Sequence, residues 1–342
     1  MKAMLITRTV NLADEPKPLQ YADIPVPEPR EGGILIRVHV CGVCHTEIDE
    51  IEGRTPPPRF PVVPGHQAVG TVEQCAAGSS RFKPGDRVGV AWIWKACGIC
   101  HFCTTGRENL CEQFVATGRD VNGGYAEYMT VPEQYAYPLP AGMSDETIAP
   151  LLCAGAIGYR SLRLTAIQDG ENLGLTGFGA SAHLVMKMIP ALFPHSKVYV
   201  FARKPEEQAF ARELGAVWAG DTAQNAPVRL HAIIDTTPVW KPLIQALGQL
   251  EKGGRLVINA IRKEQTDLSH WLSLSYPEHL WNEKEIKSVA NVTRTDVTEF
   301  LRLANKINLI PEVTEFPLAD ANIALQEIKQ QKIRGAKVLR VR

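Results

Sequence analysis

The placement of the cysteines constrains this chain more than any other feature. Four of its eight cysteines follow the pattern Cys97-x2-Cys100-x2-Cys103-x7-Cys111. Two-residue spacers let a tight turn direct successive thiolates at one centre, and four thiolates close a tetrahedron around Zn²⁺. The spacing favours a zinc site over four unligated core cysteines. Because a closed shell leaves no position for a substrate, the predicted zinc ion is structural. A ferredoxin-like iron–sulfur pattern fits less well, because its last gap is shorter and a proline follows it, whereas Glu112 follows here.

A second group of ligand candidates is scattered along the sequence. Cys44 lies in the stretch CGVCHTE, His66 follows a Pro-Gly turn, and Cys153 stands alone. A single histidine after such a turn is more often structural than a ligand. Together, however, these three side chains offer two sulfurs and one nitrogen, which is a known ligand set of catalytic zinc with an open fourth position.

Length and pattern divide the chain. Its 342 residues are too many for one ordinary core. Residues 1 to about 150 combine Gly and Pro with short β-branched runs, which predicts an irregular β-barrel or sandwich. Residues 151 to 290 alternate strands with helices, which predicts a parallel, doubly wound sheet. We expect residues 291 to 342 to return to the first domain. The strands expected in the alternating part are residues 172–176, 197–202, 232–235, 255–259 and 285–289.

Bulk composition excludes several classes of partner. Lys plus Arg equals Asp plus Glu at 37 each, so no global charge attracts nucleic acid or an acidic membrane. No apolar run approaches the roughly 20 residues of a membrane-spanning helix. The start, MKAMLITRTV, lacks the apolar region of a secretory signal, so we expect a cytoplasmic protein. In that compartment cysteines are more often ligands or core residues than disulfides.

A glycine-rich turn predicts a dinucleotide site. The expected strand 172–176 runs into Gly177-Phe178-Gly179-Ala180-Ser181-Ala182, a G-x-G-x-x-A variant of the dinucleotide fingerprint. The motif is weak alone, but its position between a strand and a helix strengthens it. We predict cofactor contacts at this turn and at the end of a later strand, at Gly177, Phe178, Gly179, Ala180, Ser181 and Asn259.

The next strand predicts which nicotinamide cofactor is preferred. NAD enzymes usually place Asp or Glu at its end, whereas this chain has Ala202-Arg203-Lys204. The absent carboxylate removes repulsion against a 2′-phosphate, and Arg203 can pair with that phosphate. We therefore expect NADP to be preferred over NAD. The alternative is that Arg203 and Lys204 are solvated loop cations.

The order of these motifs resembles that of the zinc alcohol dehydrogenases of the medium-chain family. The shared series is GVCHT, PGH, the four-cysteine pattern, a lone cysteine and a glycine-rich turn. The resemblance implies a GroES-like β domain and a Rossmann domain, with the active site in the cleft between them. It implies two zinc ions per chain, a catalytic one held by Cys44, His66 and Cys153 and a structural one held by Cys97, Cys100, Cys103 and Cys111.

The same resemblance suggests roles for further residues. Thr46 would accept the substrate proton, and Glu47 would orient His66. Two departures stand out: Gln67 replaces the usual Glu after the ligand histidine, and Asp49 occupies the place of a frequent relay histidine. His45, which we also count among the cofactor contacts, is another candidate proton carrier. Trp92, Trp94 and Trp281 match pocket-lining positions or are core aromatics.

We therefore predict an alcohol dehydrogenase or aldehyde reductase that acts on a small-molecule alcohol or aldehyde. Alternatives are a polyol, amino-alcohol or cinnamyl-type dehydrogenase, and a non-catalytic zinc protein that senses redox state, with Gln67 as the sign of the lost catalytic site. Neither nucleic acid nor a membrane is an expected partner. We expect a homo-oligomer, a tetramer rather than a dimer, with an edge strand at 285–289 that can pair across a two-fold axis.

Overall fold

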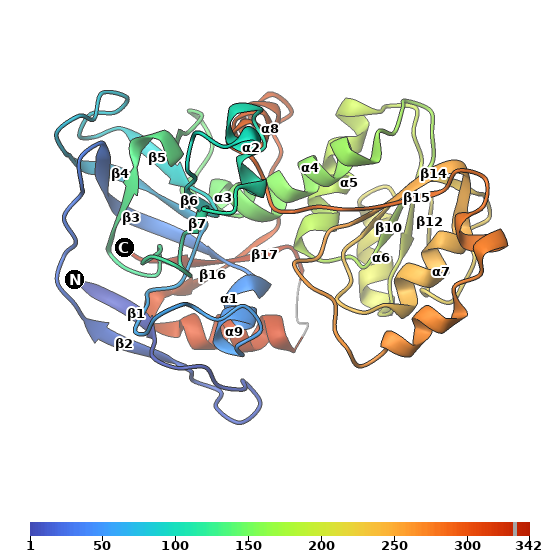
Figure 1. The fold of residues 1–342 in the computed structure, drawn as a ribbon, viewed down its shortest axis with the longest axis horizontal. Coiled ribbons are helices and arrows are strands. Elements are labelled where there is room, and N and C mark those ends of the chain that lie inside the picture. The colour runs from blue at the N-terminus through green and yellow to red at the C-terminus, as the bar shows by residue number, and fades with distance from the viewer. Residues whose placement is uncertain (331–333) are drawn as a thin grey trace. The chain divides into compact units, whose positions relative to one another are not determined.

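The protein is described by a computed structural model that covers residues 1–330 and 334–342 (Figure 1). It divides into two compact units, residues 1–156 with 292–342, and residues 157–291. The first boundary lies six residues beyond the expected one. The reason is a π-helical turn, η3 (Leu151–Gly155), which packs in the first unit because the Phe300 ring occupies the space beside Gly155.

The first unit is built on strands from both ends of the chain. Within the described residues its main sheet has the order β16-β17-β3-β4-β5-β9, and β8 also pairs with β3. β1 pairs with β2, and β6 with β7. The strands are β1 (Lys2–Ile6), β2 (Leu19–Asp23), β3 (Gly33–Val43), β4 (Ala68–Cys75), β5 (Arg87–Val90), β6 (Ile93–Lys95), β7 (Val115–Ala116), β8 (Tyr128–Pro132), β9 (Ala136–Pro138), β16 (Val313–Pro317) and β17 (Ala336–Arg340).

The last strand of the chain, β17, pairs with β3, which comes from the N-terminal part of the unit. β17 runs antiparallel to β3, with Lys337 opposite Val43 and Arg340 opposite Val40 (Figure 1). Alternating apolar residues of β3 and β4 face a common core, where Ile34, Ile36 and Val72 are almost fully buried. The tail beyond residue 291 therefore belongs to the first unit.

Short helices of the first unit connect these strands and carry the candidate site. α8 begins at an N-cap, Thr293, whose side chain accepts from the backbone N–H of Asp296 while Asp296 accepts from Thr293 in return. The helices are α1 (His45–Ile51), α2 (His101–Thr104), η1 (Glu108–Leu110), η2 (Glu133–Tyr135), α3 (Asp145–Pro150), η3, α8 (Arg294–Lys306), η6 (Leu318–Asp320) and α9 (Ala321–Lys329).

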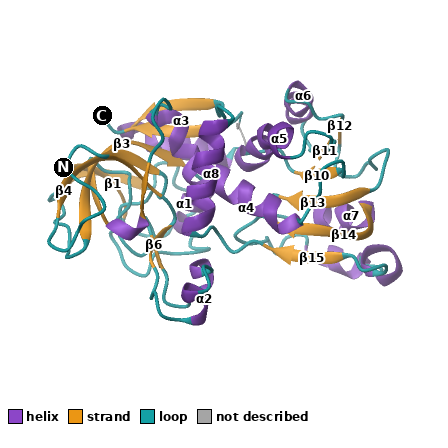
Figure 2. Cartoon of the chain, turned by 90° about the horizontal axis from the view of Figure 1, so that it is seen from above, coloured by secondary structure: helices purple, strands orange, loops and turns teal. Residues whose placement is uncertain are grey.

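The second unit contains a parallel sheet with the order β12-β11-β10-β13-β14-β15 among its described residues (Figure 2). Its strands are β10 (Leu173–Thr176), β11 (Val198–Phe201), β12 (Trp218–Gly220), β13 (Leu230–Asp235), β14 (Leu250–Ile258) and β15 (Glu285–Ser288). α6 contacts β11 and β12, and α7 contacts β10, β13 and β14. The helices are α4 (Ala156–Thr165), α5 (Ala180–Leu192), α6 (Pro205–Glu213), α7 (Lys241–Gln249), η4 (Leu268–Ser273) and η5 (Tyr276–Leu280).

The predicted fold class is thus confirmed, with one strand missed. β12 is only three residues long, too short for a periodic signal. Among the described residues no helix is long and apolar enough to cross a membrane.

Candidate metal centres and cofactor turn

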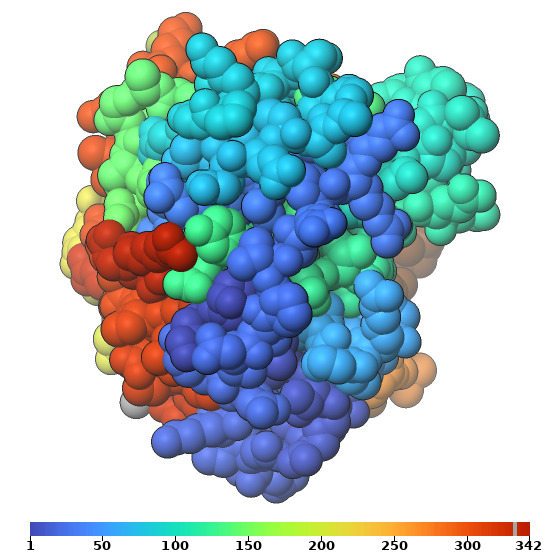
Figure 3. Space-filling view, turned by 90° about the vertical axis from the view of Figure 1, so that its left-hand side faces the viewer, coloured from blue at the N-terminus to red at the C-terminus, as the bar shows by residue number. Residues whose placement is uncertain are grey.

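The four clustered cysteines meet in a lobe that projects from the first unit (Figure 3, turquoise). Cys97 follows β6, Cys100 caps α2, Cys103 lies in α2 and Cys111 follows η1. Their sulfurs lie within 4.8 Å of one another, and Cys97 Sγ is 3.8 Å from Cys103 Sγ. Sulfurs bound tetrahedrally to Zn²⁺ at about 2.3 Å would be about 3.8 Å apart. The donor set and its spacing therefore fit a structural zinc ion.

The lobe itself stabilises thiolate at one of these positions. The backbone N–H groups of Ile99 and Cys100 lower the pKa of Cys97 to about 6. Burial acts in the opposite direction on Cys103 and raises the pKa of its thiol to about 12. Metals bind the thiolate form of cysteine, and the lowered pKa favours that form at Cys97 before a metal binds.

The three scattered candidates also converge. Cys44 is the N-cap of α1 at the end of β3, His66 precedes β4, and Cys153 lies in η3. Cys44 Sγ is 4.0 Å from Cys153 Sγ, and His66 Nε2 is 3.2 Å from the same sulfur. These three atoms form one face of a tetrahedron of the size that Zn²⁺ requires, and no fourth side-chain ligand joins them among the described residues.

Contacts between the three residues shift their proton affinities. A hydrogen bond from the Cys153 thiol lowers the pKa of Cys44 well below its ordinary value, and it raises the pKa of Cys153. Burial disfavours a charged His66, but the Glu47 carboxylate and Cys44 outweigh it and raise the His66 pKa. The group therefore concentrates negative charge where a cation would sit.

Glu47 connects two of the three candidates. Its Oε2 accepts the backbone N–H of Cys44 at 2.7 Å, and its Oε1 lies 2.8 Å from His66 Nδ1. Glu47 is fully buried. A carboxylate on Nδ1 leaves Nε2 directed at the two sulfurs, which is the orientation that a metal-binding histidine requires.

The glycine-rich turn of the second unit leaves space and donors for a phosphate. The backbone turns after β10 at Gly177, where φ is +80°, and α5 begins after its N-cap, Gly179. A Cβ added at Gly179 would meet no protein atom within 4 Å. The first turn of α5 carries neither a side-chain cap nor an acidic residue, so its N–H groups are available to an anion. The turn therefore fits the pyrophosphate of a dinucleotide.

Comparisons with known proteins show the family of this chain. Residues 30–141 match the model of the alcohol dehydrogenase GroES-like domain. The probable alcohol dehydrogenase AdhA of Mycobacterium tuberculosis is 42% identical over 94% of this chain and 92% of its own. This chain belongs to the zinc-type medium-chain alcohol dehydrogenases. The family resemblance and the alcohol dehydrogenase function predicted from the sequence are thereby confirmed, and the non-catalytic alternative is not favoured.

Solved structures share the fold of this alcohol dehydrogenase. The protein CAD from Helicobacter pylori, complexed with NADP(H), has a TM-score of 0.86 at 24% identity, and the match covers 99% of this chain and 97% of that one. A cobalt- and zinc-bound thermostable alcohol dehydrogenase from Pyrobaculum aerophilum has a TM-score of 0.85 at 22% identity, with 99% of each chain covered.

Proton-carrier candidates of this alcohol dehydrogenase differ in exposure. Thr46 is partly exposed, and its Oγ1 lies 3.4 Å from Cys44 Sγ. His45 is exposed at the start of α1. Asp49 is 1% exposed, and its Oδ1 lies 2.5 Å from Arg54 Nε. A buried, ion-paired carboxylate is poorly placed to exchange protons with water, so exposure favours His45 over Asp49.

The side chain that departs from the family pattern lies against the sheet. Gln67 is buried next to β3, and a Cβ added at Gly42 would come within 2.7 Å of its Oε1. Sequence reasoning missed a neighbouring carboxylate, Glu50. It is fully buried on the same face of α1 as Glu47, and no hydrogen-bond partner of its oxygens lies among the described residues. Burial and the Glu47 charge raise the pKa of Glu50.

The three tryptophan candidates have different surroundings. The Trp92 ring lies edge-on to His66, with centroids 5.0 Å apart. Trp94 Nε1 donates to Thr130 O at 2.9 Å, which directs this ring into the packing of β8. Trp281 is 57% exposed in the second unit, and its ring is tilted against that of Tyr276, with centroids 5.8 Å apart.

Other cofactor candidates form two small groups in the second unit. Asn259 Nδ2 donates to Ser181 Oγ at 3.1 Å, so these two residues lie together. Phe178 is buried against Phe210 and leaves only its backbone at the turn. Ala202 is buried at the end of β11 and Arg203 beside it is exposed.

A carboxylate beside these cations gave no signal in the sequence. Glu207, in the first turn of α6, is half-buried, and burial raises its pKa while Lys204 and Arg203 oppose the rise. Its carboxylate also accepts the backbone N–H of Lys204. Glu207 therefore offsets part of the positive charge that Arg203 and Lys204 bring to this corner.

Proposed function

We propose that this alcohol dehydrogenase is zinc-dependent and prefers NADP. The observation that carries the proposal is the pair of donor sets, one closed with four sulfurs and one open with two sulfurs and a nitrogen. Cys97, Cys100, Cys103 and Cys111 would hold a structural zinc ion. Cys44, His66 and Cys153 would hold a catalytic one.

The reaction removes a hydride from the alcohol carbon and a proton from the alcohol oxygen. When bound, zinc supplies Lewis acidity at that oxygen, and nicotinamide supplies the hydride acceptor. Thr46 Oγ1 accepts the hydroxyl proton, because a threonine hydroxyl can accept one proton and donate another. His45 is the exposed residue beside it and passes the proton to water. Glu47 holds His66 and Cys44 in position throughout.

The cofactor preference rests on the end of β11. Ala202 offers no carboxylate for the ribose hydroxyls, and Arg203 supplies a charged donor for a 2′-phosphate. Lys204 adds positive charge at the N-cap of α6. Because Glu207 opposes both cations, we expect NADP to be favoured by about tenfold, near the low end for a single charge-assisted contact.

The substrate is a small alcohol or aldehyde, and the site residues proposed around it are Trp92, Trp94 and Trp281. Trp92 is the strongest of them, because it contacts His66.

The enzyme is proposed to be a homotetramer rather than a dimer. β15 supports assembly, since it lies at the edge of its sheet and all four of its side chains are exposed. Light scattering that gives a monomer at micromolar concentration would reject this assembly.

One set of measurements tests the function. Purified protein is assayed for zinc content and for kcat/KM on a panel of alcohols and aldehydes with both cofactors. We expect about two zinc ions per chain, turnover with both cofactors and a higher kcat/KM with NADP. The Arg203→Ala variant should lose most of that preference. A wild type that prefers NAD, or an unchanged preference in Arg203→Ala, would refute the cofactor proposal, and one zinc ion per chain would refute the metal proposal.

A further inference from the structure

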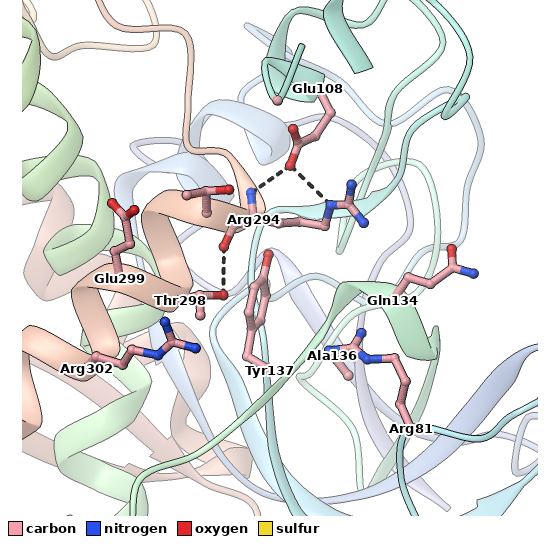
Figure 4. A pocket seen from close by; sticks show the side chains of 11 residues that line it. Arg81, Glu108, Gln134, Ala136, Tyr137, Arg294, Thr298, Glu299 and Arg302 are labelled. Atoms are coloured by element: carbon pink, nitrogen blue, oxygen red, sulfur yellow. Dashed lines mark hydrogen bonds and ion pairs between the residues drawn. The ribbon is translucent and has the colours of Figure 1, made fainter. Parts of the chain in front are cut away.

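A second site candidate lies in the first unit, in an open pocket of about 550 Å³ (Figure 4). Its walls come from η1 and the turn before it, from η2 and β9, and from one face of α8. None of the lining residues belongs to either proposed zinc site. The pocket therefore has no part in the function proposed above.

The helix α8 separates the pocket from the catalytic residues. Arg294, Thr298 and Arg302 recur every four residues and line the pocket from one face of the helix. The opposite face is buried, and there Phe300 packs against Gly155, two residues after Cys153. The pocket and the three-residue metal group thus lie on different faces of α8.

The charge of the pocket is positive and its polar groups are mostly donors. Arg81, Arg294 and Arg302 extend around it (Figure 4), against two carboxylates, Glu108 and Glu299. Glu108 is already bound by Arg294, whose backbone N lies at 2.7 Å and whose Nε lies at 3.2 Å from Oε1. Arg302 has no hydrogen-bond or ion-pair partner in the described parts of the chain. At the rim of the pocket, the Arg302 guanidinium therefore remains without a carboxylate partner among the described residues.

The floor of the pocket holds an unused donor. Tyr137 is 4% exposed, and its hydroxyl points into the pocket between the arginines (Figure 4). No partner for this hydroxyl exists among residues 1–330 and 334–342. Burial and the nearby Glu108 raise the pKa of Tyr137, so the group stays protonated and can donate. A hydroxyl that opens on a pocket and has no protein partner is free to donate to a ligand or water there.

We propose that this pocket binds a phosphate group, either free or as a small phosphate monoester. Three guanidinium groups and a hydroxyl present donors from several directions, which suits the tetrahedral oxygens of phosphate. The volume lies within the range of small-molecule pockets, so an organic substituent also fits. Arg302 and Tyr137 are the residues whose hydrogen-bonding capacity the protein leaves unused, and they contact the phosphate oxygens.

Calorimetric titration of the NADPH-saturated enzyme tests the site. Saturation fills the phosphate positions of the cofactor, and the probes are inorganic phosphate and phenyl phosphate, each against chloride at equal ionic strength. We expect both probes to bind and to raise Tm. Arg302→Gln should raise Kd about tenfold, because a charge-assisted hydrogen bond is lost, and Tyr137→Phe should raise it about threefold. Tighter binding of phenyl phosphate would identify the ligand as a monoester.

Two variants serve as controls. Arg30→Gln removes an exposed arginine outside the pocket and should leave Kd unchanged. Arg203→Ala should also leave it unchanged, because its proposed phosphate belongs to the cofactor. Absence of saturable binding, or equal Kd values in the wild type, Arg302→Gln and Tyr137→Phe, would overturn the proposal. Loss of probe binding in Arg203→Ala would show that the probe binds at the cofactor site, and it would also overturn the pocket proposal. That result would leave the zinc proposal untouched.

Discussion

The two groups of cysteine-containing ligand candidates are built in opposite ways. The lobe takes four sulfurs from one short stretch, in which local turns and backbone N–H groups do the positioning. The three-residue group takes its members from the end of β3, the loop before β4 and η3, and Glu47 aligns two of them. A site built from one short stretch can form with little support from the fold. A site built from distant segments forms only when the whole unit is folded. Four predictions test this contrast.

The largest effect is expected from His66→Ala. Removal of a proposed catalytic ligand should lower kcat/KM by about a thousandfold or more, because Lewis acidity contributes several kcal/mol to the transition state. Zinc content should fall from about two to about one per chain. His195→Ala is the matched control, since His195 is an exposed histidine paired with Asp169. Full activity in His66→Ala would remove the proposed catalytic centre.

Cys100→Ser should act on stability instead. Loss of a closed metal site is among the few single changes that cost more than about 4 kcal/mol in the free energy of unfolding. Thermal unfolding should shift strongly, while the folded fraction keeps its turnover per molecule. Cys75→Ser is the control, because Cys75 lies outside both groups and donates to Phe82 O. A variant with unchanged Tm and one zinc ion fewer would show that the lobe does not depend on metal.

Glu47→Gln should have an intermediate effect. It keeps the shape of the side chain but removes the charge beside His66 and Cys44, and changes of this kind cost about ten- to a hundredfold in metal affinity. Competition with a chelator should release one zinc ion per chain more readily than in the wild type. The lobe should keep its ion. Equal release of both ions would contradict the assignment of Glu47 to one site.

The smallest effect concerns thiol reactivity in metal-free protein. With a pKa of about 6, Cys97 is mostly thiolate at pH 7, but a less basic thiolate is also a weaker nucleophile. These effects leave Cys97 about three- to sixfold faster toward iodoacetamide than an ordinary thiol. Its rate should rise as pH increases through about 6, because deprotonation creates the reactive form. Cys103, whose pKa is about 12, is the internal control, and faster labelling of Cys103 would contradict the prediction.

The sequence predicted the strands that are long enough to show a periodic pattern of apolar residues. It expected strands over 172–176 and 232–235, and β10 and β13 occur there. It missed η3, because a π-helical turn has no sequence period of its own, and this turn carries Cys153. The first compact unit extends through this turn to Ala156, six residues past the expected boundary.

At the sites, residue types were predictable but surroundings were not. The burial of Asp49 and its ion pair with Arg54 depend on packing around α1, which no motif encodes. The backbone contact of Trp94 with β8 depends on sheet pairing in the same way. Glu50 and Glu207 lie in no recognised motif, yet both place a carboxylate beside a candidate site.

The pairing of β17 with β3 has a consequence for biosynthesis. Lys337 lies opposite Val43, so one partner emerges from the ribosome long before the other. At about 5–20 residues per second the interval is roughly 15–60 seconds. Residues 157–291 are contiguous and can fold within that interval. Until β17 is made, residues 40–43 of β3 lack the strand that pairs with them, although β8 already pairs with residues 33–37. An unpaired stretch of this kind can pair with other chains. The unit that begins first along the chain is therefore completed last, when β17 pairs with residues 40–43 of β3.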